Sequence, residues 1–436
     1  MGRFEYRSTA PVAERAILVG VDFGRNGWPI EESLDELERL AQTDGAEVVM
    51  RVTQKLDAPV PRTFIGSGKA QEIVSLVRNL DADIVIFDDE LSPSQQANLE
   101  RIIGEPTKVI DRTALILDIF GRHAKTREGR LQVQLAQLQY LYPRLRGMWS
   151  HLAGNSTRGG IGSRFGMGES QLEVDRRLIR NRISTLRRQL KELDTRRGVQ
   201  SKARWDSGVY RVALVGYTNA DKSTLLNNLT NSDVYAKDEL FATLDPTTRS
   251  LTLEEGRKIT LTDTVGFIQK LPTTLVESFK STLAEVTAAD LILCVVDASD
   301  PKADREIEAV GQVLVQIDAD KIPQVTVYNK CDLLDRESLS DLTRLHPEAE
   351  TISALEGKGL AGLLYRIARE AASGDTTMTV LIPYGKGLLM SMVHERCQVV
   401  SERYEQQGLL ATVKASPRMA ATLAPYQAED LSNPII

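Results

Sequence analysis

The stretch GYTNADKST, Gly216–Thr224, stands between an apolar run that predicts a strand and a pattern that predicts a helix. At such a junction the pattern G-x-x-x-x-G-K-[ST] forms a phosphate-binding loop, because its backbone amides converge on the phosphates and its lysine reaches them. Gly216, Lys222 and Ser223 match the pattern, but Asp221 stands where the second glycine belongs. Taken alone, the stretch fails the pattern, and a simple turn between strand and helix explains it.

Further motifs follow this loop in the order that a GTP-binding domain requires. Asp263–Gly266 (DTVG) follows the strand-like run KITLT and matches D-x-x-G, and Asn329–Asp332 (NKCD) follows VTVY and matches N-K-x-D. The aspartate of N-K-x-D can accept two hydrogen bonds from the N1–H and the exocyclic amine of guanine, which adenine does not offer. Ser353–Leu355 (SAL) matches the S-A element behind the base, and Phe241–Arg249 (FATLDPTTR) lies where a switch loop belongs. Four motifs in this order, three at strand ends, predict a GTPase fold.

The composition of the whole chain agrees with a soluble multidomain protein. Its 436 residues predict two to four domains, and 42% hydrophobic and 26% charged residues are typical of globular proteins. No apolar run approaches the roughly 18 residues of a membrane-spanning helix, and the N-terminal residues lack the apolar segment of a secretory signal. Three cysteines and four histidines form no metal or disulfide pattern. We expect a cytoplasmic monomer that associates with membranes at most peripherally.

One segment departs from the acidic character of the chain. Residues 122–206 contain 19 Lys and Arg against 7 Asp and Glu, whereas the whole chain has a formal net charge of −6. A strongly basic stretch in an acidic protein predicts a localised anionic partner. A solvated pair of charged helices is the alternative interpretation. The segment lacks an aromatic stacking surface, so we expect it to recognise RNA shape and backbone rather than single-stranded sequence.

The patterns along the chain predict an α/β protein with four domains. Strand-like runs alternate with helical patterns at both ends of the basic segment, which predicts mainly parallel sheets. Within that segment, Leu and Tyr side chains from Leu131 to Leu145 and Leu and Ile side chains from Leu172 to Leu193 recur at heptad spacing, and a glycine-rich stretch, Gly154–Gly168, separates them. We expect an α/β N-terminal domain (1–111), an antiparallel helical hairpin (112–206), a P-loop GTPase domain (207–373), and a small α+β domain (374–436). The expected strands are 16–21, 47–52, 83–87, 212–215, 259–262, 291–296, 324–328, 378–382 and 409–413, and the expected helices include 32–41, 69–80, 92–103 and 386–402.

The chain resembles the HflX family of ribosome-associated GTPases almost from end to end. The stretches that carry the resemblance are FIGSGKAQEI (64–73), FDDELSPSQQANLE (87–100), VIDRTALILDIFGRHAKTREGRLQVQLAQL (109–138), GESQLEVDRR (168–177), VGYTNADKSTLLNNLT (215–230), FATLDPTTR (241–249) and DTVGFIQKLP (263–272). The resemblance implies a GTPase that binds the large ribosomal subunit through its N-terminal domain and hairpin. The hairpin loop would reach toward the peptidyl-transferase region, and GTP hydrolysis would serve the rescue or splitting of stalled ribosomes.

The family pattern implies roles for individual residues. Lys222 would neutralise the β- and γ-phosphates, and Ser223 and Thr243 would be ligands of Mg²⁺, with Thr243 closing only around the triphosphate. Asp263 would lie near the metal ion, and the amide of Gly266 would contact the γ-phosphate. The catalytic residues implied are Lys222, Thr243, Gly266 and Asn219, and the nucleotide-binding residues are Gly216, Tyr217, Thr218, Asn219, Ala220, Asp221, Lys222, Ser223, Phe241, Ala242, Thr243, Leu244, Asp245, Asp263, Thr264, Val265, Gly266, Asn329, Lys330, Cys331, Asp332, Ser353, Ala354 and Leu355.

Three positions depart from the usual pattern. Phe267 follows the DTVG glycine, where many GTPases have a glutamine that orients water, so intrinsic hydrolysis should be slow. Asn219 resembles the asparagine with which related GTPases hold K⁺, and a role in stabilising the loop is an equal alternative. Phe165 looks like an insertion in the hairpin loop, where Met167 replaces the usual proline.

Asp221 leaves a second hypothesis open. Aspartate adds a Cβ and a negative charge beside a polyanion, and its carboxylate can divert Lys222 from the phosphates. The alternative function is therefore a ribosome-binding scaffold whose nucleotide binding is impaired. A third hypothesis, separate ATP use by the N-terminal domain, is weaker because Gly66–Lys69 (GSGK) is too short for a phosphate-binding loop and reads more simply as a turn.

Overall fold

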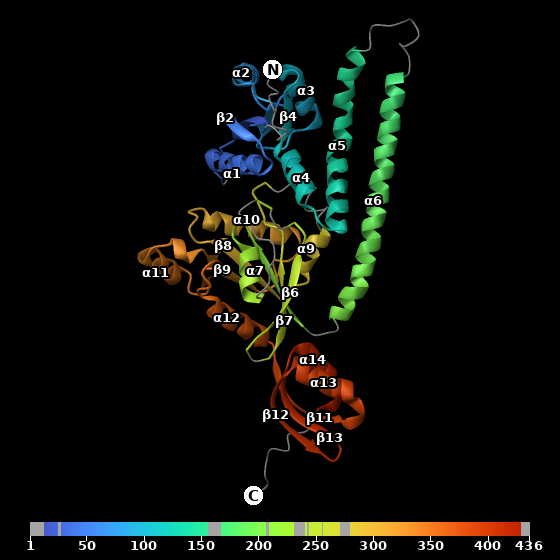
Figure 1. Ribbon diagram of the computed structural model, residues 1–436, viewed down its shortest axis with the longest axis vertical. Helices are drawn as coiled ribbons and strands as arrows, with labels where there is room; N and C mark the ends of the chain where they lie inside the picture. Colours follow the sequence, from blue (N-terminus) through green and yellow to red (C-terminus); the bar gives the residue numbers. More distant parts are fainter. Residues whose placement is uncertain are drawn as a thin grey trace, which may run out of the picture. The chain divides into compact units, whose positions relative to one another are not determined.

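The computed structural model describes residues 13–24, 28–155, 167–205, 209–230, 240–241, 244–254, 256–270 and 280–428. The chain forms two compact units (Figure 1). The first comprises Met1–Lys191 with Gln269–Ser278, and the second comprises Glu192–Ile268 with Phe279–Ile436. Within the described residues, none of the helices combines the length and the apolar character needed to cross a bilayer.

The first unit begins with a parallel sheet of order β2-β1-β3-β4. Its central strands are apolar runs buried on both faces, as expected where helices cover a parallel sheet on both sides. Helix α3 starts with a capping box, since the side chain of Ser92 accepts a hydrogen bond from the Gln95 amide and Oε1 of Gln95 accepts one from the Ser92 amide. The elements are β1 (Arg15–Asp22), α1 (Ile30–Thr43), β2 (Glu47–Lys55), α2 (Ser67–Leu80), β3 (Ile84–Phe87), α3 (Pro93–Ile103), β4 (Lys108–Asp111) and α4 (Arg112–His123).

Helix α4 continues this α/β fold beyond the expected boundary at residue 111. It packs against α1, and most of its first two turns are buried. Its first residue, Arg112, is 2% exposed and is held by the carboxylates of Asp88 and Glu36 at 2.7 and 2.6 Å. A buried guanidinium requires such partners, so Arg112 fixes the start of α4 against the sheet.

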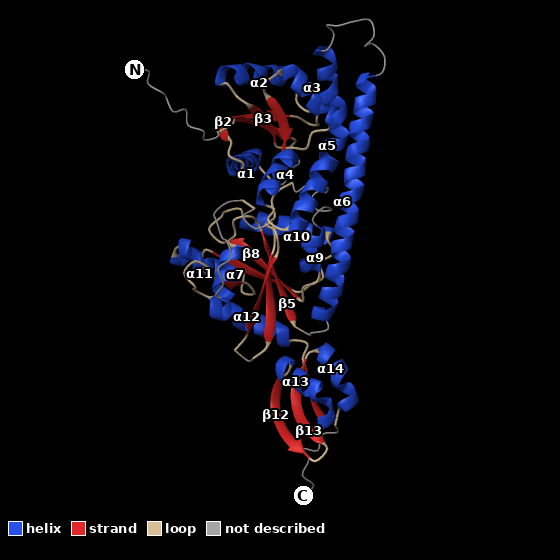
Figure 2. Ribbon diagram, turned by 45° about the vertical axis from the view of Figure 1, so that its right-hand side comes forward, coloured by secondary structure: helices blue, strands red, loops and turns tan. Residues whose placement is uncertain are grey.

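The two long helices of the basic segment form the expected antiparallel hairpin. Helix α5 spans Arg127–Asn155 and α6 spans Met167–Trp205, and they run side by side in both views (Figures 1 and 2). Arg182 donates a hydrogen bond to Gln134 at 3.4 Å, and the guanidinium of Arg176 lies 5.8 Å from the centre of the Tyr142 ring. These contacts pair later residues of α6 with earlier residues of α5, as antiparallel helices must. The loop residues 156–166, with Arg158, Arg164 and Phe165, lie outside the described residues.

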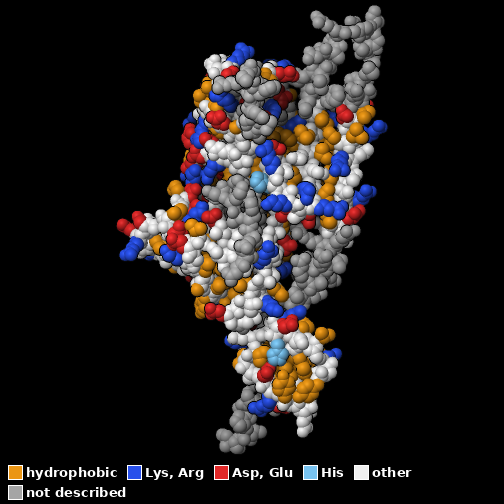
Figure 3. Space-filling view, in the orientation of Figure 1, with side chains coloured by type: hydrophobic (Ala, Val, Ile, Leu, Met, Phe, Trp, Pro, Cys, Tyr) orange, Lys and Arg blue, Asp and Glu red, His pale blue; other side chains and the backbone are white. Residues whose placement is uncertain are grey.

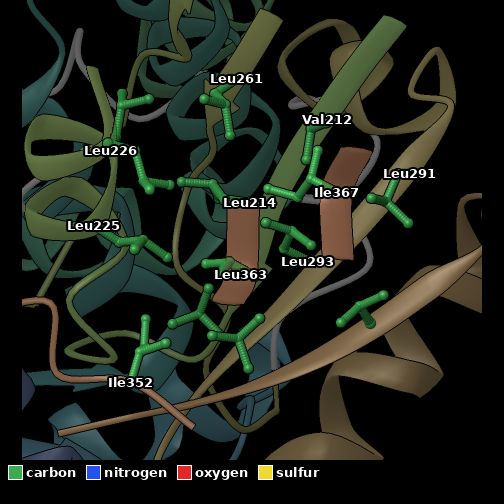
Figure 4. Packing of buried hydrophobic residues seen from close by; sticks show 14 of the residues in the cluster. Val212, Leu214, Leu225, Leu226, Leu261, Leu291, Leu293, Ile352, Leu363 and Ile367 are labelled. Carbon is green, nitrogen blue, oxygen red and sulfur yellow. The ribbon is translucent and has the colours of Figure 1, made fainter. Parts of the chain in front are cut away.

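The second unit contains a six-stranded sheet of order β10-β9-β8-β5-β7-β6, parallel except for β6. Leu225 and Leu226 of α7 and Leu363 and Ile367 of α12 lie around Leu214 of β5 in its core (Figure 4). The predicted doubly wound α/β domain is confirmed. The elements are β5 (Tyr210–Gly216), α7 (Lys222–Thr230), β6 (Thr247–Thr252), β7 (Lys258–Asp263), α9 (Lys280–Thr287), β8 (Leu291–Asp297), α10 (Ala303–Gln316), β9 (Gln324–Asn329), η1 (Cys331–Leu333), α11 (Arg336–Leu345), β10 (Glu350–Thr351) and α12 (Leu360–Ala372).

The C-terminal part of this unit is a small antiparallel sheet of order β11-β13-β12 with two helices. The predicted helix 386–402 is wrong in its second half. The helix stops at Arg396, and Gln398–Glu405 pairs with the following strand, because Val399 and Val400 favour an extended chain that can add to the edge of β13. The elements are β11 (Thr376–Pro383), η2 (Tyr384–Lys386), α13 (Gly387–Arg396), β12 (Gln398–Glu405), β13 (Gly408–Ala415), α14 (Pro417–Leu423) and η3 (Ala424–Tyr426).

Candidate nucleotide site

The phosphate-loop sequence connects the end of β5 to the start of α7, as predicted. Gly216, the last residue of β5, has φ +152°, and a Cβ built on it would lie 2.1 Å from the carbonyl oxygen of Val295 in the neighbouring strand β8. No side chain fits there, so glycine is required by the packing of the two strands. The chain then turns into α7, whose first residue is Lys222.

Lys222 lies inside the loop rather than in solvent. Its Nζ donates hydrogen bonds to the carbonyl oxygens of Tyr217 at 2.7 Å and Gly216 at 3.2 Å, and the residue is 6% exposed. Burial lowers the pKa of Lys222 below its ordinary value, although the nearby carboxylate of Asp263 acts in the opposite direction. An anion bound in the loop would favour the charged ammonium, as expected of a phosphate-binding lysine.

Ser223 and Asp263 bring two oxygen ligands together at the beginning of α7 and the end of β7. The hydroxyl of Ser223 donates to Oδ2 of Asp263 at 2.6 Å, and Asp263 is fully buried. A hydroxyl and a carboxylate are hard oxygen donors of the kind that Mg²⁺ accepts, usually together with phosphate oxygens. The donor set therefore fits Mg²⁺ at this position.

The DTVG motif lies directly against the phosphate loop. A Cβ on Gly266 would come within 2.8 Å of the backbone of Thr218, so the close approach requires glycine. The amide of Thr218 donates a hydrogen bond to the carbonyl oxygen of Phe267 at 2.8 Å. The amide of Phe267 donates one to the carbonyl oxygen of Gly216 at 3.1 Å. Phe267 is 1% exposed. Its ring belongs to the core, and a phenyl ring offers no hydrogen bond to an attacking water molecule.

The base-recognition motif is joined to the phosphate loop by Asn329. Its Nδ2 donates to the carbonyl oxygen of Ala220 at 3.0 Å, and its Oδ1 accepts from the amide of Ala354 at 2.8 Å. Asn329 thus connects three of the predicted motifs. Asp332 follows in the short helix η1, and its Oδ1 is buried with no hydrogen-bond partner in the described part of the chain. A buried carboxylate oxygen is suited to accept the N1–H of guanine.

Asp221 does not pair with Lys222 as the sequence suggested. Its backbone has φ +59°, a left-handed conformation that aspartate tolerates better than most residues, and its side chain is 36% exposed. Its Oδ2 lies 3.6 Å from Nζ of Lys330, which also lies 2.8 Å from Oδ2 of Asp297. The carboxylate of Asp221 is therefore oriented toward the base-recognition loop, and Lys222 keeps its own contacts within the phosphate loop.

The other predicted site residues differ in burial, and two of them lie outside the described residues. Phe241 and Leu244 are buried at 2%, and Asn219 has φ +66° in the loop. Leu355 is 78% exposed at the end of the S-A motif. Ala242 and Thr243 lie outside the described residues, so the predicted second ligand of Mg²⁺ stays a prediction. The nucleotide-binding roles stay predictions for Tyr217, Thr218, Ala220, Asp245, Thr264, Val265, Cys331, Ser353 and Ala354.

Two residues outside the motifs also shape the site. Asp297, at the end of β8, holds Lys330, and Asn228 of α7 donates to the carbonyl oxygen of Ala354. Asp297 stands at the end of an apolar strand, a position where polar residues often face a ligand site in parallel sheets. Its role could therefore have been predicted from the sequence. Asn228 lies within a helix, and nothing in its sequence position indicates a role in the site.

Comparisons with known proteins cover nearly the whole chain. Three family models match: the GTP-binding GTPase N-terminal model at residues 31–121, the GTP-binding GTPase Middle Region at 123–204, and the 50S ribosome-binding GTPase at 211–330. The GTPase HflX of Caldanaerobacter subterraneus subsp. tengcongensis is 46% identical over 402 residues, which span 92% of this chain and 90% of that protein. The GTPase HflX of Escherichia coli is 44% identical over 398 residues, spanning 91% of this chain and 92% of that one. A solved GTP-binding protein from Sulfolobus solfataricus in complex with GDP is 22% identical, with a TM-score of 0.42 over 83% of this chain and 99% of that one.

Proposed function

The chain belongs to the HflX family of GTPases, and from this premise we propose that it binds the large ribosomal subunit and couples GTP hydrolysis to the rescue or splitting of stalled ribosomes. The reaction itself, GTP to GDP and phosphate, follows from the GTPase domain and the relatives. Within this proposal Ser223 and Thr243 hold Mg²⁺, and Asn219 holds K⁺. The protein acts in the cytoplasm, where ribosomes are.

The observation that carries the ribosomal part of the proposal is the basic hairpin. Figure 3 shows Lys and Arg side chains on the visible face of this region. On α6, Arg177, Arg187 and Arg188 are exposed. Guanidinium groups on a helix surface meet phosphate oxygens without reading a sequence, as recognition of folded ribosomal RNA requires. We propose that α5 and α6 contact ribosomal RNA and that the loop between them reaches toward the peptidyl-transferase region.

A charge-reversal variant of the hairpin tests this proposal. Arg177, Arg187 and Arg188 are replaced together by Glu, and cosedimentation with large subunits is measured at several salt concentrations. The matched control reverses Lys321, Arg336 and Arg344, which are exposed on the second unit, and changes the net charge equally.

We expect the hairpin variant to lose at least tenfold in ribosome affinity and to show a smaller dependence on salt, because fewer counterions are released. The control should bind like the unchanged protein. Equal binding of both variants, or binding that does not depend on salt, would contradict the role of the hairpin. Nucleotide affinity should be the same in all three proteins.

Asp221 favours a second candidate, a ribosome-binding scaffold that scarcely uses nucleotide. A carboxylate in the phosphate loop opposes a polyphosphate by charge, and it occupies the position at which the pattern requires glycine. Titration of the purified protein with a fluorescent GDP analogue separates the two candidates. Saturable binding with preference for guanine supports the enzyme, whereas ribosome binding without measurable nucleotide binding supports the scaffold.

A further inference from the structure

The phosphate loop and the base-recognition loop touch through two neighbouring pairs of residues. Asn329 donates to the carbonyl oxygen of Ala220, and the next residue, Lys330, forms an ion pair with the residue after Ala220, Asp221. The first pair belongs to the motifs themselves. The second pair depends on the aspartate that this chain has in place of glycine, so a standard phosphate loop cannot form it.

Lys330 lies between two carboxylates. Its Nζ is 2.8 Å from Oδ2 of Asp297 and 3.6 Å from Oδ2 of Asp221, and its side chain is 18% exposed. Asp297 is itself held in place, since its Oδ1 accepts hydrogen bonds from the amide and the hydroxyl of Ser299. Lys330 has a left-handed backbone with φ +62°, which sets the direction of its side chain from the end of β9.

We propose that Lys330 is the counter-ion of Asp221 and thereby preserves nucleotide binding in a phosphate loop that carries an extra negative charge. Without the ammonium, the carboxylates of Asp221 and Asp297 would lose the positive charge that lies between them, next to the site expected to bind the phosphates. With it, the group of Asp221, Asp297 and Lys330 carries one net negative charge instead of two, and the carboxylate of Asp221 has an ammonium partner other than Lys222. Lys330 thus positions Asp221, beyond any contact that it makes with the base.

This inference rests on the proposed binding of guanine nucleotides at the phosphate loop. The test must therefore distinguish failure of the Asp221–Lys330 pairing from failure of nucleotide binding itself. The test is a double-mutant cycle with Asp221→Asn and Lys330→Gln. Asparagine keeps the size of the side chain and tolerates the left-handed backbone, and glutamine keeps a polar side chain without the charge. The dissociation constant of a fluorescent GDP analogue is measured for the unchanged protein, both single variants and the double variant, at low and high salt.

Lys330→Gln should weaken binding at least threefold more in the protein with Asp221 than in the Asp221→Asn background. High salt should reduce this difference, because the pair is partly exposed and is screened. Lys330→Arg should restore most of the loss in the Asp221 protein, since it restores the charge. A purely structural role of Lys330 would produce neither the salt effect nor the rescue by arginine.

Equal losses in both backgrounds, or a greater loss in the Asp221→Asn background, would overturn the proposal. If the unchanged protein binds too weakly for titration, the melting temperatures of the four nucleotide-free proteins supply the same cycle. Lys330→Gln should then lower the melting temperature more when Asp221 is present, and an equal decrease would overturn the proposal. Failure of Asp221→Gly to bind any guanine nucleotide would instead contradict nucleotide binding at this loop, whatever the cycle shows.

Discussion

The side chain of Asn329 donates a hydrogen bond to the carbonyl oxygen of Ala220 at 3.0 Å and so ties the base-recognition loop to the phosphate loop. Asn329 is 1% exposed, and its other polar atom accepts from Ala354. Asn329→Ala leaves the Ala354 amide and the Ala220 carbonyl without this partner, which costs about 1–3 kcal/mol for each buried group left unsatisfied. We expect both a lower melting temperature and at least tenfold weaker binding of guanine nucleotides.

Asn98→Ala is the control for this prediction. Asn98 also donates to a backbone carbonyl, that of Arg62, but it belongs to the first unit, whereas the predicted nucleotide motifs belong to the second. Calorimetry and nucleotide titration should show a small loss of stability and unchanged nucleotide affinity. Unchanged nucleotide affinity in Asn329→Ala as well would refute the linking role of Asn329.

Gly216→Ala tests the contact between the phosphate loop and β8. The added Cβ would lie 2.1 Å from the Val295 carbonyl oxygen, so the two strands must move apart. We expect the variant to lose nucleotide binding and a large part of its stability. The matched change Gly311→Ala places a methyl group on helix α10 with nothing within 4 Å, and it should raise stability by roughly 0.5–1 kcal/mol. A folded Gly216→Ala protein with normal affinity would show that the close contact is not required.

Asp221→Gly should tighten the binding of GTP and GDP at least tenfold and raise hydrolysis. An unscreened repulsion at about 4 Å with an effective dielectric of about 20 amounts to about 4 kcal/mol. The effect should be smaller here, because Asp221 is 36% exposed and paired with Lys330. Titration of both proteins with the same fluorescent nucleotide measures the ratio. If the protein with Asp221 already binds as tightly as the glycine variant, the steric and electrostatic argument fails.

A K⁺ ion at Asn219 predicts a dependence of hydrolysis on the monovalent cation. Phe267 is buried and supplies no group that orients water, so a cation near the phosphates is a natural alternative source of electrostatic stabilisation for hydrolysis. GTP turnover should be faster in K⁺ than in Na⁺ at equal ionic strength, and Asn219→Ala should remove the difference. Equal rates in the two salts for the unchanged protein would leave Asn219 as a residue that stabilises the loop.

The nucleotide motifs could be located from the sequence because their chemistry fixes local spacing. A glycine at the end of a strand, a lysine six residues later and an aspartate at the end of the next parallel strand can be recognised without knowing the fold, and the structure brings Lys222, Ser223 and Asp263 together. The strands were predictable for the same reason, since buried parallel strands such as β8 are continuous apolar runs.

The pairing of Asp221 could not be predicted, because it depends on tertiary contacts. Lys222 is adjacent in sequence, but its ammonium is satisfied by backbone carbonyls, while Lys330 approaches from a distant loop. Strand β12 was missed because the pattern from Lys386 to Glu402 also suits a helix, and only pairing with β13 selects the extended form. Local patterns define these alternatives, and long-range packing chooses between them.

We propose that this GTPase has the large ribosomal subunit as its partner. The test is GTP turnover by the purified protein, measured with and without large subunits. We expect slow turnover by the protein alone and at least tenfold faster turnover with large subunits, and the gain should be lost in the Arg177, Arg187 and Arg188 reversal variant. Turnover that is the same with and without large subunits, in a protein that binds guanine nucleotides, would show that the large subunit is not the partner that stimulates hydrolysis.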